Sequence, residues 1–257
     1  MSRRRWALVA GLFAALIVLT QVDGLVLDGA RGIGYTVCSQ IPSHSFFVAG
    51  QQLPLCARCT GIYLGFLVGL GGMALLGKRG SCLWPPRTVM VVLLLAIGAM
   101  VGDGFNSLTS ALPEAVQVYE PTNLLRLITG VAAGTSLALL EIPLLNDALW
   151  AKREMTESVS DLGELLGFVI IAALVVVLVY SENPLILYPV SILGIVGVFA
   201  TIGAAGTALA ATLLRRERQS NGLREAMPLF VAGLGLSIVA MAALGALRYY
   251  LSLPLGI

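Results

Sequence analysis

Long apolar runs, separated by short polar connections, make up most of this 257-residue chain. They approach or exceed the ~18 residues that a helix needs to cross a bilayer. Charged residues form only 12% of the chain, about half the share found in soluble domains. We therefore expect an all-α polytopic membrane bundle of about seven helices, a single integral membrane domain over residues 1–257. The predicted spans are Trp6–Gln21, Thr60–Gly77, Thr88–Gly104, Asn123–Leu140, Asp161–Tyr180, Pro184–Leu213 and Pro228–Tyr250.

The basic residues fall unevenly between these spans. Twelve of the sixteen Lys and Arg lie before the first span or in the connections after the second, fourth and sixth. Arg31, Arg58, Arg126 and Arg248 remain for the opposite side. Because connections rich in Lys and Arg stay in the cytoplasm, we expect a cytoplasmic N-terminus in a bacterial or archaeal plasma membrane.

Three of the four cysteines and the single histidine fall in one segment, from Cys38 to Tyr63. Their spacing is Cys38-x5-His44-x11-Cys56-x2-Cys59, and the last pair opens an apolar run. Two thiolates on one tight turn commonly form half of a tetrahedral zinc site. Cys38 and His44 would supply the other half if the loop folds back. The segment predicts a site for zinc or another divalent metal on an ordered extracytoplasmic loop.

Other interpretations of these cysteines stay open. A structural disulfide suits an oxidising extracytoplasmic location, although three cysteines leave one unpaired. A redox pair of Cys56 and Cys59 is the third, because a helix N-terminus favours the thiolate. That pair would suit a membrane thiol-disulfide or quinone oxidoreductase. A further alternative is a non-catalytic subunit of a larger membrane complex, or of a homo-oligomer.

A polar group is predicted near the extracytoplasmic ends of the second, third and fourth spans. Asp103 and Arg126 are ionisable residues within spans, which is costly unless they are paired. Each is therefore a candidate for a pocket or for an ion pair that locks two helices. Thr122 and Asn123 are candidate helix caps. Arg58 would pair with a carboxylate or a lipid phosphate, or extend to the interface. We expect Arg58, Asp103, Asn123 and Arg126 to line a pocket for a lipid headgroup or a small molecule.

Glycine recurs every fourth residue on the second span, at Gly61, Gly65 and Gly69. Such a stripe of small residues lets another helix approach closely, and core packing is its expected role.

The chain lacks the sequence motifs of several common enzyme classes. The chain has no Gly-rich phosphate loop, no His-Glu-x-x-His and no Ser-His-acid set, so ATP-driven chemistry and these hydrolytic mechanisms are not expected. A single histidine excludes a heme with two histidine ligands. The basic residues are spread over short connections, so we expect the lipid bilayer, and not nucleic acid, as the partner.

The run Pro54–Gly65, PLCARCTGIYLG, resembles the motif of a family of membrane proteins, domain-of-unknown-function family 2085. Upstream, Cys38, Gln40, Pro42 and Ser45-Phe46 are similar to its first half-motif. Its second motif resembles Asp103-Gly104 and Thr122–Gly130. The resemblance covers residues 30–140 and leaves the three C-terminal helices, 160–257, outside. The family often has Cys-His-Gln where this chain has Cys38-Ser39-Gln40, so His44 is either a substitute ligand or a bystander. The resemblance implies no activity.

Overall fold

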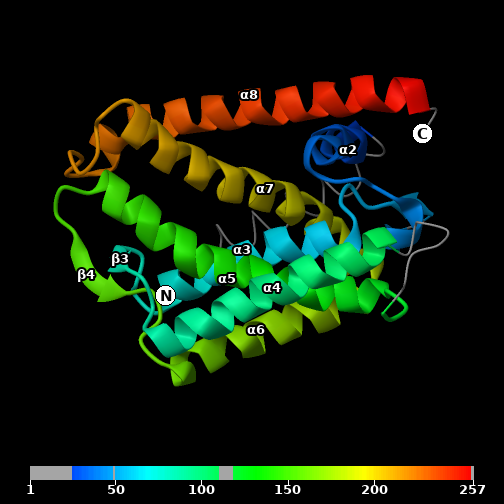
Figure 1. Ribbon diagram of the computed structural model, residues 1–257, viewed down its shortest axis with the longest axis horizontal. Helices are drawn as coiled ribbons and strands as arrows, with labels where there is room; N and C mark the ends of the chain where they lie inside the picture. Colours follow the sequence, from blue (N-terminus) through cyan, green and yellow to red (C-terminus); the bar gives the residue numbers. More distant parts are fainter. Residues whose placement is uncertain (1–24, 49, 110–117, 256–257) are drawn as a thin grey trace, which may run out of the picture.

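The computed structural model describes residues 25–48, 50–109 and 118–255, and the first predicted span, Trp6–Gln21, lies outside them. The described residues form seven α-helices (Figure 1). Six of these, α3 to α8, are long and apolar enough to cross a membrane, so the predicted all-α polytopic bundle is confirmed. The helices are α2 (Leu25–Val37), α3 (Ala57–Leu75), α4 (Arg87–Thr109), α5 (Asn123–Leu149), α6 (Leu162–Tyr180), α7 (Pro184–Leu213) and α8 (Leu223–Leu255).

Short strands join the connections at each end of the bundle. The hairpin of β1 (Phe47–Val48) and β2 (Gln51–Gln52) lies between α2 and α3. At the other end, β3 (Ser81–Leu83), after α3, pairs in parallel with β4 (Glu154–Glu157), after α5. An isolated bridge ties Trp150 to Ser220, which brings the α7–α8 connection to the same end.

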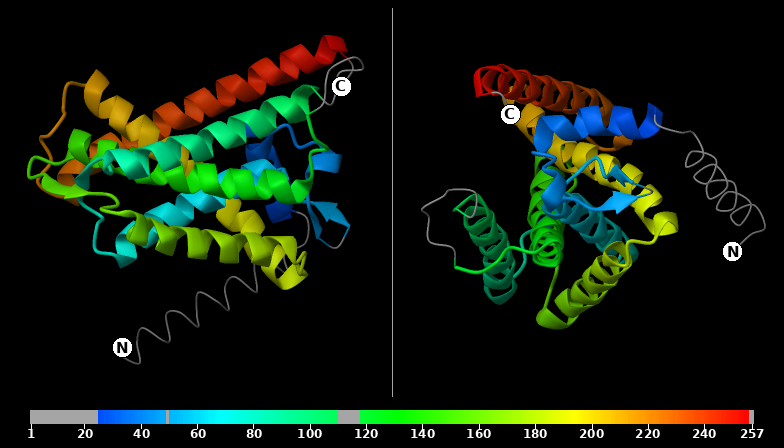
Figure 2. Two further views of the ribbon diagram at one scale, coloured as in Figure 1. Left: turned by 60° about the horizontal axis from the view of Figure 1, so that its bottom comes forward. Right: turned by 90° about the vertical axis from the view of Figure 1, so that its right-hand side faces the viewer.

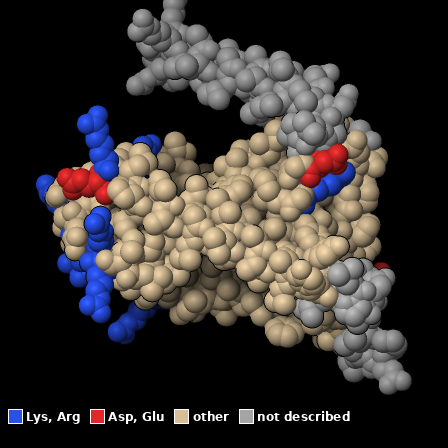
Figure 3. All heavy atoms as spheres, turned by 90° about the horizontal axis from the view of Figure 1, so that it is seen from above, with Lys and Arg blue, Asp and Glu red and all other residues tan. Residues whose placement is uncertain are grey.

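The two ends differ in charge. The end formed by the α3–α4, α5–α6 and α7–α8 connections, here the basic end, carries the Lys and Arg side chains that gather on one side of Figure 3. The opposite end, here the cysteine end, holds Cys38, Cys56 and Cys59 with Arg31 and Arg58. The apolar helices between the ends show few charged side chains on the face in Figure 3.

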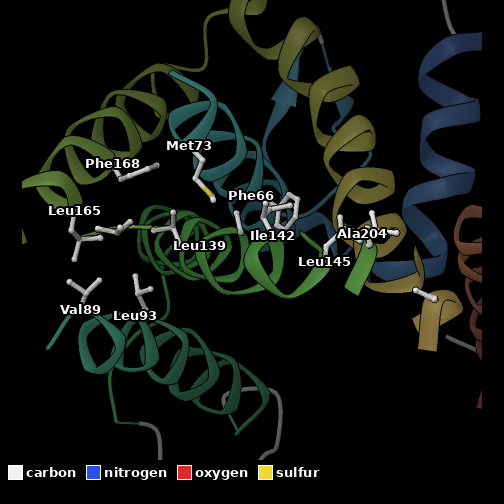
Figure 4. Close-up of a cluster of buried hydrophobic side chains, with 14 of the residues drawn as sticks. Phe66, Met73, Val89, Leu93, Leu139, Ile142, Leu145, Leu165, Phe168 and Ala204 are labelled. Atoms are coloured by element: carbon white, nitrogen blue, oxygen red, sulfur yellow. The ribbon is translucent and has the colours of Figure 1, made fainter. Parts of the chain in front are cut away.

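The helix α5 forms the centre of the bundle. In the most apolar stretch of α5, 61% of the residues are buried, whereas the share is 17% in α4 and in α6. Both α4 and α6 pack on α5 and splay apart from each other (Figure 2). A cluster of buried apolar side chains surrounds α5 (Figure 4) and includes Phe66 of α3, Leu93 of α4, Leu139 of α5 and Phe168 of α6.

The closest helix contact joins α3 and α5, which run parallel from the cysteine end to the basic end. The predicted glycine stripe faces α5: a Cβ placed on Gly61 would lie 2.6 Å from the carbonyl oxygen of Leu127. The hydroxyl of Thr135 donates to the carbonyl of Gly65 across the contact, at 3.1 Å. Glycines allow this approach because they place no side chain between the two backbones.

The helix α2 was not predicted as an element. At 13 residues it is shorter than a span, and it packs against α7 and α8 at the cysteine end. It delivers Cys38 to the site, because its last residue is Val37.

A single added methyl group tests the α3–α5 contact. We expect Gly61→Ala to lower the free energy of unfolding by about 1–3 kcal/mol, because the methyl group would overlap the backbone of α5. Gly71→Ala on the same helix is the matched control: its Cβ has no atom within 4 Å. It should leave stability unchanged or raise it by up to about 1 kcal/mol. Thermal unfolding of both variants in detergent measures the difference, and equal effects would contradict the proposed packing.

Candidate functional site

Three of the four predicted metal ligands meet at the cysteine end. The Sγ atoms of Cys38, Cys56 and Cys59 all lie within 4.8 Å of one another. Cys56 is the N-cap residue of α3, and Cys59 follows in its first turn, as the sequence predicted. Cys38 arrives from the end of α2. All four cysteines of the chain are free thiols.

Backbone N–H groups point at the sulfur of Cys38. The N–H of Gln40 lies 3.4 Å from it and the N–H of Cys56 lies 3.2 Å from it. Hydrogen bonds from the Cys38 and Cys59 thiols hold the pKa of Cys56 well below its usual value, and the charge of Arg58 acts in the same direction. The hydrogen bond with Cys56 raises the pKa of Cys38. The shared hydrogen bonds therefore favour the thiolate form at Cys56 over the thiolate form at Cys38.

His44 does not join the three sulfurs. It ends the short 3-10 turn Pro42–His44 on the loop between Cys38 and Cys56, and it is half-buried. Burial lowers the pKa of its imidazole, and the positive charge of Arg126 lowers it further. Both effects favour the neutral imidazole, and the charge of Arg58 acts in the same direction.

Amide side chains hold the loop that carries Cys38. The side chain of Gln40 donates to the carbonyls of Arg31, at 2.8 Å, and Pro54, at 2.7 Å. That of Gln52 donates to the carbonyl of Gln40 and to the hydroxyl of Ser45, at 2.7 and 2.9 Å. Gln40 has a positive φ of 52°, an uncommon conformation for a residue with a side chain. These hydrogen bonds hold the loop to itself and to α2.

Arg248 of α8 adds a long-range contact that sequence reasoning missed. Its guanidinium donates to the carbonyl oxygens of Tyr35, at 2.9 Å, of Ser39, at 2.8 Å, and of Cys38. It also stacks over the ring of Tyr35, 4.2 Å from the ring centre. No local pattern indicates this role, because more than 200 residues separate Arg248 from the loop.

Asp103 and Arg58 form a buried ion pair. An ion pair of Asp103 with Arg126 was one alternative offered by the sequence, and the structure pairs Asp103 with Arg58 instead. Arg58 lies in the first turn of α3, and its Nε is 3.1 Å from Asp103 Oδ2, while its Nη2 contacts the same oxygen. The hydroxyl of Tyr119 donates to the other oxygen, Oδ1, at 2.8 Å, and Arg58 Nη2 also donates to Ser107 at 2.9 Å. Asp103 is only 2% exposed, so the pair satisfies an otherwise costly buried charge.

Arg126 lies in the first turn of α5 and is 4% exposed. Its Nη1 donates to Asn123 Oδ1 at 2.9 Å, while its buried Nε has no partner among the described residues. Thr122 caps the helix, as predicted, and accepts from the N–H of Leu125 at 3.2 Å. The electrostatic interactions of Arg126 include those with Arg58, Asp103 and Cys56, so the predicted polar residues lie in one region.

Comparison with known proteins places these residues within the part of the chain that matches one protein family. A family model described as "Predicted membrane protein (DUF2085)" matches residues 38–140, a range that contains every predicted site residue. An uncharacterised protein of Methanocaldococcus jannaschii is 31% identical over 116 residues, 45% of this chain and 68% of that protein. Another, of Methanothermobacter thermautotrophicus, is 35% identical over 104 residues, 40% of this chain and 83% of that protein. No solved structure matches the chain.

A double-mutant cycle tests the ion pair of Arg58 and Asp103. We expect Arg58→Gln and Asp103→Asn each to destabilise the protein, and their combination to cost less than the sum, with a coupling of about 1–3 kcal/mol. Thermal unfolding in detergent measures all four proteins. The control combines Arg58→Gln with Asp147→Asn, since Asp147 pairs with Arg153 and Arg218 at the basic end. These two changes should be additive, and additivity in both cycles would argue against the pair.

Proposed function

This chain belongs to the DUF2085 family of predicted membrane proteins, and we propose that it binds a divalent metal ion, preferably zinc, through Cys38, Cys56 and Cys59. The observation that carries the proposal is the mutual distance of the three sulfurs, all within 4.8 Å. Sulfur ligands about 2.3 Å from a tetrahedral zinc lie about 3.8 Å apart, so a contraction of at most about 1 Å would complete three corners of the site.

The donor chemistry also suits zinc. Thiolates are soft ligands that favour zinc over magnesium or calcium. The N–H groups of Gln40 and Cys56 would stabilise the charge on the Cys38 sulfur. These contacts would act behind the metal ligands and orient them.

His44 is our candidate for the fourth ligand, and the loop that carries it would have to move to bring its ring to the three sulfurs. It is the only histidine of the chain, and it belongs to the loop that joins Cys38 to Cys56. Four protein ligands would close the coordination sphere, which is typical of zinc sites that stabilise a fold. We therefore assign the metal a structural role in the loop at the cysteine end.

The polar cluster beside the metal site is the proposed functional site. Arg58 connects the two, because it lies between Cys56 and Cys59 in sequence and pairs with Asp103. With Asn123 and Arg126, these residues would bind a small molecule or a lipid headgroup. The metal would hold the start of α3, and hence Arg58, in place.

We propose an extracytoplasmic location for this end of the bundle. Its support is the gathering of Lys and Arg at the basic end, which the positive-inside rule places in the cytoplasm. Archaeal relatives make an archaeal plasma membrane a suitable location.

One observation favours a second function, thiol–disulfide chemistry. The lowered pKa of Cys56 would make it a nucleophile beside Cys59. In that role the two thiols would pass two electrons and two protons to a quinone or a disulfide substrate, and would end as a Cys56–Cys59 disulfide. The metal experiment separates this function from the first.

We expect purified protein to contain about one zinc ion per chain, measured by plasma mass spectrometry. Cys56→Ser and Cys59→Ser should each remove the ion and lower the unfolding temperature, because metal-binding energy is also folding energy. His44→Ala should weaken binding less than either serine variant if it is a substitute ligand.

Cys82→Ser is the matched control, since Cys82 is a buried free thiol at the basic end. It should retain the metal. After chelation and denaturation, the wild-type protein should show four free thiols, because none of its four cysteines forms a disulfide. Metal-free protein whose stability is unchanged in both serine variants would contradict the metal site, and rapid alkylation of Cys56 near pH 7 would then support the redox function.

Labelling of intact cells tests the orientation. A membrane-impermeant maleimide should react with Ser43→Cys and should reach Lys152→Cys only after permeabilisation. Both positions are exposed, at the cysteine end and the basic end respectively. The signal is compared with wild-type protein, which carries the native cysteines. The reverse labelling pattern would place the cysteine end in the cytoplasm.

A further inference from the structure

Among the described residues, Arg126 is a buried cation that forms no ion pair. It is 4% exposed, and among the described residues no carboxylate lies within ion-pair distance of it. Its neighbour Asp103 is already bonded to Arg58 and Tyr119. An arginine buried in this way is strongly destabilising unless something else neutralises it and accepts its hydrogen bonds.

The position of Arg126 increases this cost. The guanidinium folds back toward the start of its own helix, where Nη1 contacts Asn123. The N-terminus of a long helix carries a partial positive charge, and α5 has 27 residues. The parallel helix α3 starts beside it, because the backbone at Arg58 packs on Gly130. Two positive helix ends and two arginines therefore meet at one place.

Some backbone donors at this helix end also have no acceptor among the described residues. The first intrahelical hydrogen bond of α5 runs from the N–H of Arg126 to the carbonyl of Thr122, at 3.1 Å. The N–H groups of Asn123, Leu124 and Leu125 precede it, and the Thr122 hydroxyl accepts only from Leu125. Asn123 and Leu124 thus keep N–H groups directed out of the helix end, as anion-binding helices do.

We propose that the N-terminus of α5 binds a phosphate group through the guanidinium of Arg126 and the N–H groups of Asn123 and Leu124. The inference names the ligand class of the polar cluster in the proposed function and rests on that proposal, but it does not depend on the metal. A phosphate group fits because it accepts several hydrogen bonds at once, and because a planar guanidinium binds it through two parallel bonds. The first turn of a spanning helix lies at the depth of lipid headgroups, so the phosphate can come from a lipid or from solution.

Thermal unfolding of the full chain in detergent tests this site. Inorganic phosphate is titrated at constant ionic strength, with chloride as the reference anion. We expect a saturable rise of the unfolding temperature with phosphate and none with chloride, because a ligand that binds only the folded state stabilises it. Arg126→Gln should lower the affinity for phosphate about 10- to 100-fold, the usual effect of losing charge-assisted hydrogen bonds. Arg126→Lys should have an intermediate effect.

Two further readouts separate binding from a structural role. Without phosphate, Arg126→Gln should unfold at the same temperature as wild type or higher, because it removes an unneutralised buried charge. Arg224→Gln, exposed at the start of α8, should keep the full phosphate response. Metal content is measured on every sample. If a variant loses the phosphate response but keeps its metal, the phosphate site has failed and the metal site has not.

A soluble lipid identifies the source of the phosphate group. Dihexanoyl phosphatidic acid should stabilise the protein through Arg126 if the site accepts a headgroup, whereas a response to inorganic phosphate only would assign it to a free anion. A response to neither, or an equal response in Arg126→Gln, would overturn the proposal. Glu114, between α4 and α5, lies outside the described residues. If Glu114→Gln destabilises the wild type but not Arg126→Gln, a carboxylate of the chain is the partner and the proposal is wrong.

Discussion

The contact between α3 and α5 governs the rest of this structure. Glycines on both helices remove the side chains that would keep two backbones apart, and the helices pack in parallel from the cysteine end. Their N-termini therefore lie side by side. This places Cys56, Arg58 and Cys59 of one helix next to Arg126 of the other, so the same packing that forms the bundle core also assembles the candidate site.

Parallel packing has an electrostatic consequence. Two adjacent helix N-termini carry partial charges of the same sign, and Arg58 and Arg126 add two full positive charges. Asp103 compensates Arg58 through a buried ion pair, whereas no carboxylate among the described residues pairs with Arg126. Parallel packing therefore brings the two arginines, Asp103 and the three sulfurs together at the cysteine end, while most Lys and Arg lie at the basic end. It also explains why an anionic ligand would suit Arg126.

The loop at the cysteine end does not depend on a metal alone. Gln40 and Gln52 bind its backbone, and Arg248 of α8 holds the carbonyls around Cys38. A metal bound by the three cysteines would add a further link between α2 and α3. We therefore expect its loss to loosen this end of the bundle while the α3–α5 contact and the apolar cluster around α5 persist.

The amino-acid sequence by itself determined the membrane class, six described spans, the position of Cys56 and Cys59 at a helix start, and the cap at Thr122. Each follows from local hydrophobic patterns or from residues close in the chain, where helix geometry sets the distances. The tertiary structure decided that Asp103 pairs with Arg58, that His44 stays apart from the three sulfurs, and that Arg248 supports Cys38. These pairings join residues from different helices, and they depend on which helices pack together and how closely. That information resides in side-chain packing across the bundle and not in any local pattern.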